Sequence, residues 1–491
     1  MSEALAGLPP PPPPAEPRPA AAVILWREGP GGRELFWVRR GEALSFAGGF
    51  YAFPGGRLDR ADASVPVPGL EGEAAAFAAC ACRELFEETG VLLARGALRL
   101  SRAERDEGRR AVLGDRQGFG AFLSANGLSL DAFRLEPAGR WVTPAFLPVR
   151  YDARFFAARL PEGEEASVWP GELSAGEFVS PSRALDLWER GDVLLHPPNW
   201  WGIRCLSRAA PPAALPELRN PPPDLRIEFQ RGIWNQALRT PTLPPATHTN
   251  CWVLDLGGGV AVVDPGSPFP EEQARLDRFL DGLAAEGRPP REVWLTHHHG
   301  DHVGGAARLA ARGLEVLAHP LTAARVGLPA RPVREGDLLH GRWRALFTPG
   351  HAPGHLAFHD ERSGALLAGD LVSTLSTIVI DPPEGDMAEY LRQLERLRAL
   401  RPRTLYPAHG PPAPNGPGKL EEYLAHRRAR EEKVLAALGR GGTLAELTRL
   451  AYDDTPAAML PAAERSCLAS LEKLRAEGRA RLDGERWSLA G

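Results

Sequence analysis

The sequence predicts a multidomain α/β protein, and three observations support that prediction. The chain has 491 residues, and length alone suggests roughly three domains of about 150 residues. Between 226 and 420, short apolar runs such as CWVLDL alternate with amphipathic stretches such as EEQARLDRFLDGLAAEG, which is typical of layered α/β folds. The last segment, 421–491, instead has three helical stretches followed by a short hairpin pattern.

The rest of the chain divides where its composition changes. Residues 1–20 are Pro-rich, and we expect a disordered tail there. Residues 21–207 form a first domain that opens with two strand patterns, AAVILW and LFWVRR, joined by a Gly-rich turn. The stretch 208–225 is again Pro-rich and is predicted to link this domain to the next one.

Composition excludes several classes of protein. The net charge of -4 and the pI of about 6.4 give no global field toward nucleic acid or an anionic membrane. No apolar run approaches the length of about 20 residues that spans a bilayer, so we expect no membrane partner. The five cysteines form no CxxC pair, which favours a reducing compartment, the cytoplasm. The abundant Pro, Gly, Ala and Arg are typical of a bacterial protein.

The C-terminal segment predicts a winged helix. Its helical stretches are LEEYLAHRRAREEKVLAAL, TLAELTRLAY with Thr443 as the expected N-cap, and PAAERSCLASLEKLRAEG, and the hairpin pattern is RARLDGERWSL. Arg427, Arg428 and Arg430 could contact phosphates, and a solvated helix face is the alternative.

A histidine cluster, THHHGDHVGG at 296–305, indicates a metal site. Four of the 13 histidines fall within six positions there. His297, His299 and His302, together with Asp301, follow a predicted strand on a tight Gly-rich turn. Imidazole and carboxylate form the ligand set that suits zinc. Further ligands stand after other predicted strands: His351, Asp370 and His409.

This pattern resembles the HxHxDH signature of the metallo-β-lactamase superfamily over 226–420. The resemblance implies a four-layer αβ/βα sandwich with two Zn²⁺ ions, or Fe or Mn in their place. The implied ligands are His297, His299 and His351 for one ion, Asp301, His302 and His409 for the other, and Asp370 as a bridge. Asp264 would support the ligands by hydrogen bonding. The histidines expected to be structural are His298, His355, His319, His340 and His359.

Two such ions would perform metal-assisted hydrolysis, with Asp301 as the catalytic residue that orients the attacking water. The bond that is cleaved stays open at this point. The tail resembles the winged-helix extension of the β-lactamase-like-protein-2 family, whose mitochondrial members act on single-stranded RNA. The stretch TPGHAPGH also resembles glyoxalase II and other thioesterases. RNA phosphodiesters and esters or thioesters therefore compete as substrates.

The first domain carries RELFEETG at 83–90. Glu84, Glu87 and Glu88 fall on one face of a predicted helix, and Arg83 would pair with one of them. Clustered carboxylates suit Mg²⁺ or Mn²⁺ together with a substrate phosphate. The segment resembles the nudix box, RExxEExG, and the preceding FAGGFYAFPGGRLD resembles the coenzyme A diphosphatase-like, nudix motif 19-type branch.

That resemblance implies a nudix α/β/α sandwich over 21–207. Glu84 and Glu87 would be catalytic, and Gly55, Gly56 and Arg83 would bind substrate. An insertion separates the glycines from Arg83, and the acidic position expected upstream falls on Ala75. Three acidic residues are candidates to replace it: Asp59, Asp62 and Glu73.

These observations predict a bifunctional metal-dependent hydrolase. The expected partners are a small-molecule diphosphate or acyl-coenzyme A-type substrate, with single-stranded RNA and a homodimer also open. The alternative is a catalytically silent, regulatory nudix domain fused to a glyoxalase II-like or acyl-coenzyme A thioesterase.

Overall fold

The computed structural model describes residues 13–42, 44, 47–116, 118–169, 171–223 and 225–490. The chain folds as two compact units that meet in sequence at Arg231 and Gly232. Of the tail expected at 1–20, residues 1–12 lie outside the described residues, and Arg18–Ala20 already belong to the first strand.

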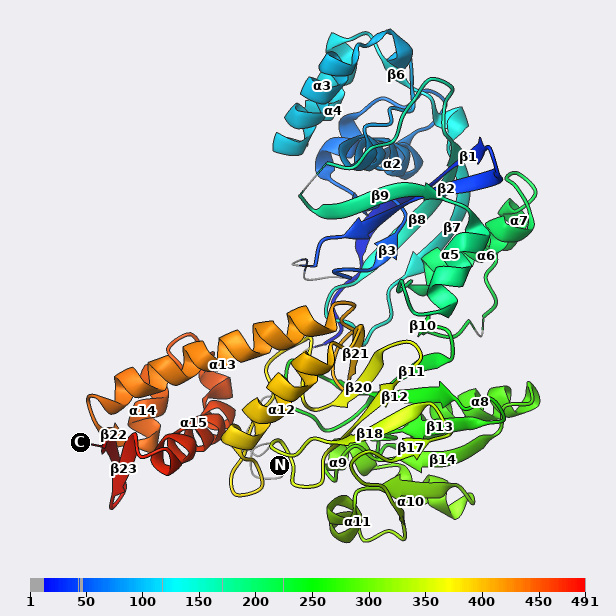
Figure 1. Cartoon of the computed structure of the whole chain (residues 1–491). Helices are drawn as coiled ribbons and strands as arrows, with labels where there is room; N and C mark the ends of the chain where they lie inside the picture. The colour runs from blue at the N-terminus through cyan, green and yellow to red at the C-terminus, as the bar shows by residue number, and fades with distance from the viewer. Residues whose placement is uncertain are drawn as a thin grey trace. The chain divides into compact units, whose positions relative to one another are not determined.

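The first unit, Pro14–Arg231, is built on one seven-stranded sheet with helices on both faces (Figure 1). Its main path runs β3-β2-β1-β8-β7, with β4 paired to β1 and β9 paired to β2. The sheet strands are β1 (Arg18–Gly29), β2 (Gly32–Arg40), β3 (Tyr51–Ala52), β4 (Gly55–Arg57), β7 (Glu136–Val142), β8 (Tyr151–Arg159) and β9 (Leu173–Val179). The α-helices are α2 (Gly72–Thr89), α3 (Arg102–Gly114), α4 (Gly118–Ala125), α5 (Pro181–Glu189), α6 (Pro197–Arg208) and α7 (Leu215–Arg219). Smaller elements are β5 (Ala94–Arg95), β6 (Ser129–Leu130), β10 (Glu228–Gln230), η1 (Arg60–Ser64), η2 (Ala97–Arg99) and η3 (Ala132–Arg134).

Strand β1 shows why this sheet is covered on both faces. Successive side chains of a strand point to opposite faces. Val23 and Leu25 pack into a core with α2, whereas Ile24 and Trp26 pack into a second core with α5 and α6. Because both faces are apolar, each needs a helical layer. The predicted α/β/α sandwich is confirmed.

The stretch expected to be a linker, 208–225, is partly built into this unit. It contains α7, whose Leu215 and Leu218 are buried in the same core as Trp201. The surrounding prolines dominate the composition of the stretch, so composition predicts a linker there. The two leucines that anchor the short helix have little effect on that composition. The compact unit extends to Arg231.

The second unit begins with two sheets. The strands of the first, paired in this order, are β11 (Ile233–Arg239), β12 (His248–Asp255), β13 (Val260–Val263), β14 (Pro290–Trp294), β15 (Glu315–Ala318) and β16 (Arg331–Pro332). Those of the second are β17 (Leu338–Leu339), β18 (Trp343–Phe347), β19 (Leu356–Asp360), β20 (Ala365–Gly369) and β21 (Thr404–Pro407). The helices are α8 (Pro270–Ala285), α9 (Gly300–Val303), α10 (Ala306–Ala311), α11 (Pro320–Val326), α12 (Met387–Leu400) and α13 (Gly416–Leu438).

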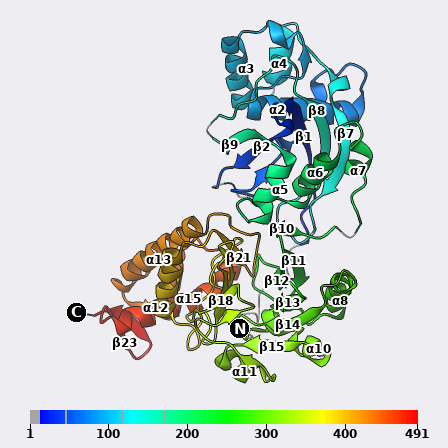
Figure 2. The ribbon, with the colours of Figure 1, turned by 45° about the vertical axis from the view of Figure 1, so that its right-hand side comes forward.

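The two sheets face each other, and each carries helices on its outer face. Trp294 on β14 contacts Phe358 on β19, with ring centroids 5.0 Å apart, and Trp252 on β12 contacts Tyr406 on β21 at 5.1 Å. Helices α8 and α10 cover the first sheet, and α12 and α13 cover the second (Figure 2). The predicted αβ/βα four-layer sandwich is confirmed.

The C-terminal part is a winged helix, as predicted. After α13 it comprises β22 (Gly442–Thr443), α14 (Leu444–Ala451), η4 (Ala457–Met459), α15 (Leu460–Ala476), β23 (Ala480–Asp483) and β24 (Arg486–Leu489). Thr443 is the N-cap of α14 and forms a reciprocal capping box with Glu446. Helix α13 continues from the sandwich into this domain, so the two share a helix.

Two expectations from the sequence concern the cysteines and the helices of the described residues. All five cysteines are buried and free, as the scattered spacing predicted. Among these residues, no helix combines the length and apolar character needed to cross a membrane.

Candidate metal centre and carboxylate site

The predicted ligands of the second unit converge because each follows the end of a strand. A sheet delivers the residues after its strands to one rim, where loops carry function. His297 and His299 follow β14, and Asp301 and His302 lie in the short helix α9. His351 follows β18, Asp370 follows β20, and His409 follows β21. The close contact of α9 with Gly266 leaves no room for a side chain: a Cβ there would lie 1.7 Å from the Asp301 carbonyl oxygen.

His297, His299 and His351 form the first ligand group. His299 Nδ1 lies 2.9 Å from His297 Nε2 and 3.0 Å from His351 Nε2. His297 and His351 each have a hydrogen-bond acceptor beside Nδ1, so both present the lone pair of Nε2. The single N–H at His299 Nδ1 can donate to only one of these two Nε2 lone pairs. A shared cation would satisfy all three nitrogens.

Asp301, His302 and His409 form the second group, and Asp370 lies between the two. Asp370 Oδ2 is 3.6 Å from both His302 Nε2 and His351 Nε2, and its Oδ1 is 3.4 Å from His409 Nε2. Asp301 Oδ2 is 3.6 Å from His409 Nε2. Asp370 therefore touches both groups, in the position of a bridging ligand.

Buried atoms without hydrogen bonds show that these residues fit metal ions. Asp301 Oδ1, His302 Nε2 and Asp370 Oδ1 are buried and have no hydrogen-bond partner. Leaving a buried polar atom unsatisfied costs roughly 1–3 kcal/mol. Three such atoms at one place, all of types that bind transition metals, are explained by bound cations.

The other side of each ligand is fixed by hydrogen bonds, as expected for metal-binding imidazoles. His302 Nδ1 donates to Asp264 Oδ2 at 2.8 Å, and Asp264 also accepts from the Thr296 backbone N–H (2.8 Å) and hydroxyl (2.6 Å). Asp264 thus supports the ligand shell, as the resemblance implied. Its backbone has the left-handed φ of 49°, which is uncommon for a residue with a side chain.

Two further imidazoles are held by backbone carbonyls. His351 Nδ1 donates to the Val379 oxygen and His409 Nδ1 to the His248 oxygen, both at 3.0 Å. These acceptors had no signal in the sequence because any residue type has a carbonyl. In each case the hydrogen bond directs Nε2 toward the cluster.

Buried charges compensate one another in this cluster. Burial alone would lower the pKa of His302, but the carboxylates of Asp370 and Asp301 outweigh it and hold that pKa well above its usual value. Burial would raise the pKa of Asp370, but His409 and His302 hold it well below its usual range. Cations that replaced the histidine protons would take over this compensation, so metal binding should release protons.

Two histidines that we expected to be structural border the cluster. His355 is buried: its Nε2 accepts the Asp370 backbone N–H at 3.2 Å, so its Nδ1 carries the proton and donates to the Thr348 hydroxyl at 2.8 Å. It therefore supports Asp370 without ligating a metal. His298 instead pairs with Glu384, Nε2 to Oε2 at 2.9 Å, beside His299. Glu384 was missed because it lies far from the histidines in sequence.

In the first unit, α2 places Arg83 and its acidic neighbours as the helical spacing predicted. Arg83 Nη1 donates to Glu84 (2.8 Å) and Glu87 (2.9 Å), and all three side chains are buried. Glu88 accepts the Gly55 backbone N–H at 2.9 Å. Among the described residues, the three glutamates do not form one of the tight groups that could hold an ion as they stand. Glu84 and Glu87 pair with Arg83, whereas Glu88 bonds to the backbone of Gly55.

Asp62 takes the upstream acidic position that the sequence left open. Its Oδ1 lies 2.7 Å from Arg83 Nε and its Oδ2 2.9 Å from Arg83 Nη2, and Asp62 is 1% exposed. Asp59 instead caps η1, and Glu73 is largely exposed. The insertion brings Asp62 to Arg83 from 21 residues away.

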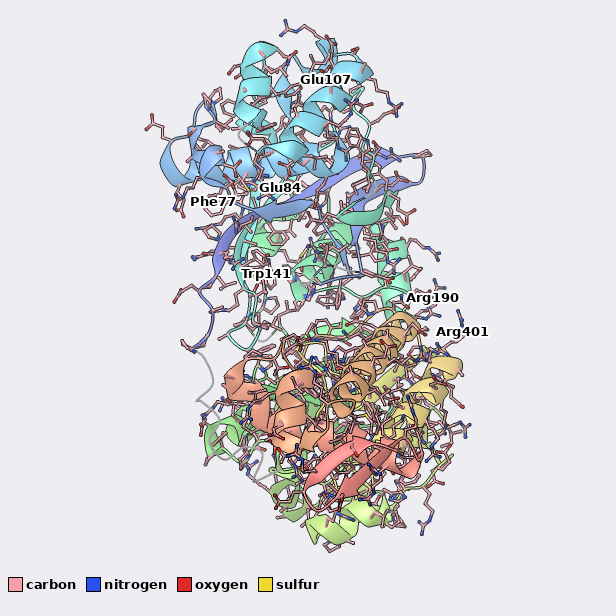
Figure 3. The ribbon with its side chains drawn as sticks, turned by 90° about the vertical axis from the view of Figure 1, so that its left-hand side faces the viewer. Phe77, Glu84, Glu107, Trp141, Arg190 and Arg401 are labelled. Carbon is pink, nitrogen blue, oxygen red and sulfur yellow. The ribbon has the colours of Figure 1, made fainter. Side chains whose placement is uncertain are left out.

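Close packing explains the two glycines before this site. Strand β4 pairs with β1 at Gly55 and Gly56. A Cβ on Gly55 would lie 2.4 Å from the Ala21 oxygen, and one on Gly56 would lie 2.5 Å from the carboxylate of Glu84. Glu84 lies on the side of α2 that faces the sheet (Figure 3). The pKa of Glu84 is raised to about 7 overall. Burial is the main cause, the charge of Arg83 opposes it, and the charge of Glu87 adds to it.

The arginines of α13 are occupied by the protein itself. Arg427 is 7% exposed and donates to the Ile378 oxygen, and Arg430 donates to the Ala451 oxygen and to Asp454. Arg428 pairs with Glu395 at 2.9 Å. The expectation that these three could meet phosphates is wrong for Arg427, because its guanidinium is buried, and the bonds of the other two compete with phosphate.

Comparison with family models agrees with this architecture. Residues 66–206 match the NUDT19 Nudix domain, 244–409 the metallo-beta-lactamase superfamily, and 443–487 the beta-lactamase associated winged helix domain. "Lactamase-like protein nscB" of Trichophyton rubrum is 31% identical over 252 residues, which are 46% of this chain and 76% of the relative. "Lactamase-like protein vrtG" of Penicillium aethiopicum is 30% identical over 268 residues, 47% of this chain and 85% of the relative.

Solved structures resemble each half. The metallo-beta-lactamase family protein TTHA1429 of Thermus thermophilus is 26% identical and covers 53% of this chain and all (100%) of its own, with a TM-score of 0.46. A NUDIX hydrolase of Alicyclobacillus acidocaldarius is 29% identical and covers 42% of this chain and 99% of its own, with a TM-score of 0.39.

Proposed function

We propose that this chain, which belongs to the metallo-beta-lactamase superfamily and also carries a Nudix domain, is a bifunctional metallohydrolase of coenzyme A-type compounds. Its sandwich would hydrolyse an ester or thioester of a small acyl compound with two zinc, iron or manganese ions. Its Nudix site would cleave a diphosphate with Mg²⁺ or Mn²⁺. The proposal rests above all on the buried His/Asp cluster, in which Asp370 touches both ligand groups.

The residues of the cluster have separable roles in such a reaction. Two bound ions would lower the pKa of a water molecule and polarise the group that it attacks. Asp301 has one oxygen, Oδ2, near His409 Nε2 and a second buried oxygen, Oδ1, without a hydrogen-bond partner. One of these oxygens would bind the second ion, and the other would accept a hydrogen bond from the attacking water. Asp264 and Thr296 keep His302 oriented, so the geometry exists before substrate arrives.

A small acyl substrate is favoured over RNA by the state of the α13 arginines. RNA binding relies on cationic side chains that are free to meet phosphates. Arg427 is buried against a backbone carbonyl, and Arg430 and Arg428 are paired. A coenzyme A thioester contains both a thioester and a diphosphate, so one substrate family would suit both sites of the chain.

A second candidate keeps the Nudix site silent and makes it a sensor that regulates the other site. The observation in its favour is that Arg83 already pairs with Glu84 and Glu87 and that, among the described residues, no tight ion-binding group includes them. Mg²⁺ binding at this site would require these carboxylates to reorient, at least in part.

Crossed inactivation tests both proposals. The purified chain is offered acyl-coenzyme A thioesters, single-stranded RNA, and diphosphates such as coenzyme A and nucleotide sugars. We expect Asp301→Ala to abolish thioester cleavage and spare diphosphate cleavage, and Glu87→Gln to do the reverse. The activity that each variant retains shows that the variant is folded, so each serves as the folding control for the other. Cleavage of RNA alone would overturn the thioester proposal, and no diphosphate cleavage by the wild type would favour the silent Nudix site.

A further inference from the structure

The segment 378–386, which precedes α12, holds the His351 side of the metal centre. Val379 accepts the hydrogen bond of His351 Nδ1 at 3.0 Å. At the other end of the segment, the Asp386 backbone N–H donates to the Gly350 oxygen at 2.8 Å, directly beside His351. The orientation of this imidazole therefore depends on where the segment lies.

The residues on either side of Val379 are fixed by the C-terminal domain. The Ile378 oxygen accepts from Arg427 on α13, and the Ile380 backbone N–H donates to Ser466 Oγ on α15 at 3.2 Å. Arg427 and Ser466 are 7% and 5% exposed, so water does not compete readily for these bonds.

A third contact comes from Arg465, also on α15. Its Nε donates to Asp381 and its Nη2 donates to the Pro382 oxygen at 2.6 Å. Helix α15 also packs against the sandwich: Ala469 lies in the same core as Tyr390 and Leu394 of α12. In Figure 1 and Figure 2, α15 lies next to α12 and α13.

We propose that the C-terminal winged helix is a positioning device for the metal centre. Ser466, Arg465 and Arg427 hold the segment 378–386 so that the Val379 carbonyl directs His351 Nε2 toward His299, and His351 would hold an ion together with His297 and His299. This inference rests on the proposed metal function and gives a role to the buried Arg427, whose guanidinium faces the protein interior. Ser466 and Arg465 are positioning residues, because the contacts that carry their role are with the segment 378–386.

The test measures metal affinity directly. Apo protein of the wild type, Ser466→Ala and Arg465→Met is titrated with Co²⁺ and followed by visible absorption, and both metal sites are counted. We expect the affinity of one of the two ions to fall about 3- to 10-fold, less than the roughly 10- to 100-fold that loss of a direct partner costs. The other ion should bind as in the wild type. Amide hydrogen exchange of 378–386 should quicken.

Matched variants separate positioning from general stability. Lys473→Met removes an ion pair on the same helix, with Glu431 at 2.7 Å, that does not contact the segment. It should leave both affinities unchanged. Arg465→Lys keeps a charged donor and should restore part of the affinity. All variants are compared by thermal unfolding.

Two outcomes overturn the inference in different ways. If the wild type binds two Co²⁺ ions and Ser466→Ala and Arg465→Met do the same with unchanged affinity, the positioning role is wrong and the proposed function stands. If the folded wild type binds no Co²⁺, the metal function itself is wrong, and the positioning role falls with it.

Discussion

Replacing Glu84 by glutamine should change how the metal-free first unit responds to pH. Glu84 is buried on α2 against Gly56 and shares one cation, Arg83, with Asp62 and Glu87. Its pKa is raised from 4.5 to about 7, chiefly by burial. The folded state thus binds this proton more tightly than the unfolded state does. The resulting stabilisation is complete below pH 4.5 and is lost as pH rises through about 7.

The magnitude follows from those two values. The difference between about 7 and 4.5, at about 1.36 kcal/mol per pH unit, corresponds to about 3 kcal/mol. Glutamine keeps the acceptor that Arg83 uses and cannot ionise. In EDTA at pH 8, Glu84→Gln should therefore stabilise the unit by up to about 3 kcal/mol relative to wild type, and near pH 4.5 the two should be equally stable.

Hydrogen exchange of peptides from 72–89 measures this effect locally, so the second unit does not interfere. Burial also raises the pKa values of Glu87 and Glu88, and both remain in the variant. Because the charge of Glu84 contributes to the raised pKa of Glu88, the difference between the two proteins reports Glu84 together with its effect on Glu88. Adding Mg²⁺ at pH 8 should stabilise the wild type more than the variant if the carboxylate binds the ion. Parallel pH profiles for the two proteins in EDTA would refute the reasoning.

Three further predictions concern single carboxylates and the first ligand group. Asp301→Ala should lower turnover in the sandwich by about a thousandfold or more, because both metal binding and water orientation are lost. The turnover of Asp301→Asn should recover partly at high zinc concentration. Near-normal turnover of Asp301→Ala would contradict the mechanism. Elemental analysis should find close to two transition-metal ions per chain of wild type and fewer in the double variant His297→Ala, His299→Ala; folded wild type without metal would refute the site. Asp62→Asn should destabilise the first unit in urea by about 1.5–3 kcal/mol, because it weakens the two charge-assisted hydrogen bonds to Arg83 while Glu84 and Glu87 still compensate the arginine. Asp59→Ala, which removes a helix cap, should cost about 1 kcal/mol; equal midpoints would show that Asp62 is not the partner that matters.

Features with local causes could be predicted from the sequence. The ligands His297, His299 and His302 stand together on one turn, and the capping box of Thr443 spans three residues. The apolar run AAVILW in β1 likewise predicts a strand from neighbouring residues. These patterns depend on backbone geometry over a few residues, so the chain itself carries them.

The partners of buried charges could not be predicted in this way. Asp59, Asp62 and Glu73 were all candidates for the acidic position upstream of Arg83, and only the path of the inserted loop brings Asp62 to the arginine. Arg427 belonged to a charged helical run, yet the fold turns it inward onto the Ile378 carbonyl. Every residue type has a backbone carbonyl, so the sequence does not mark which carbonyl will accept a hydrogen bond. A long side chain such as arginine can point to solvent, bind a substrate or pack in the core. Which of these it meets depends on segments far away in the sequence, and tertiary packing alone brings those segments together.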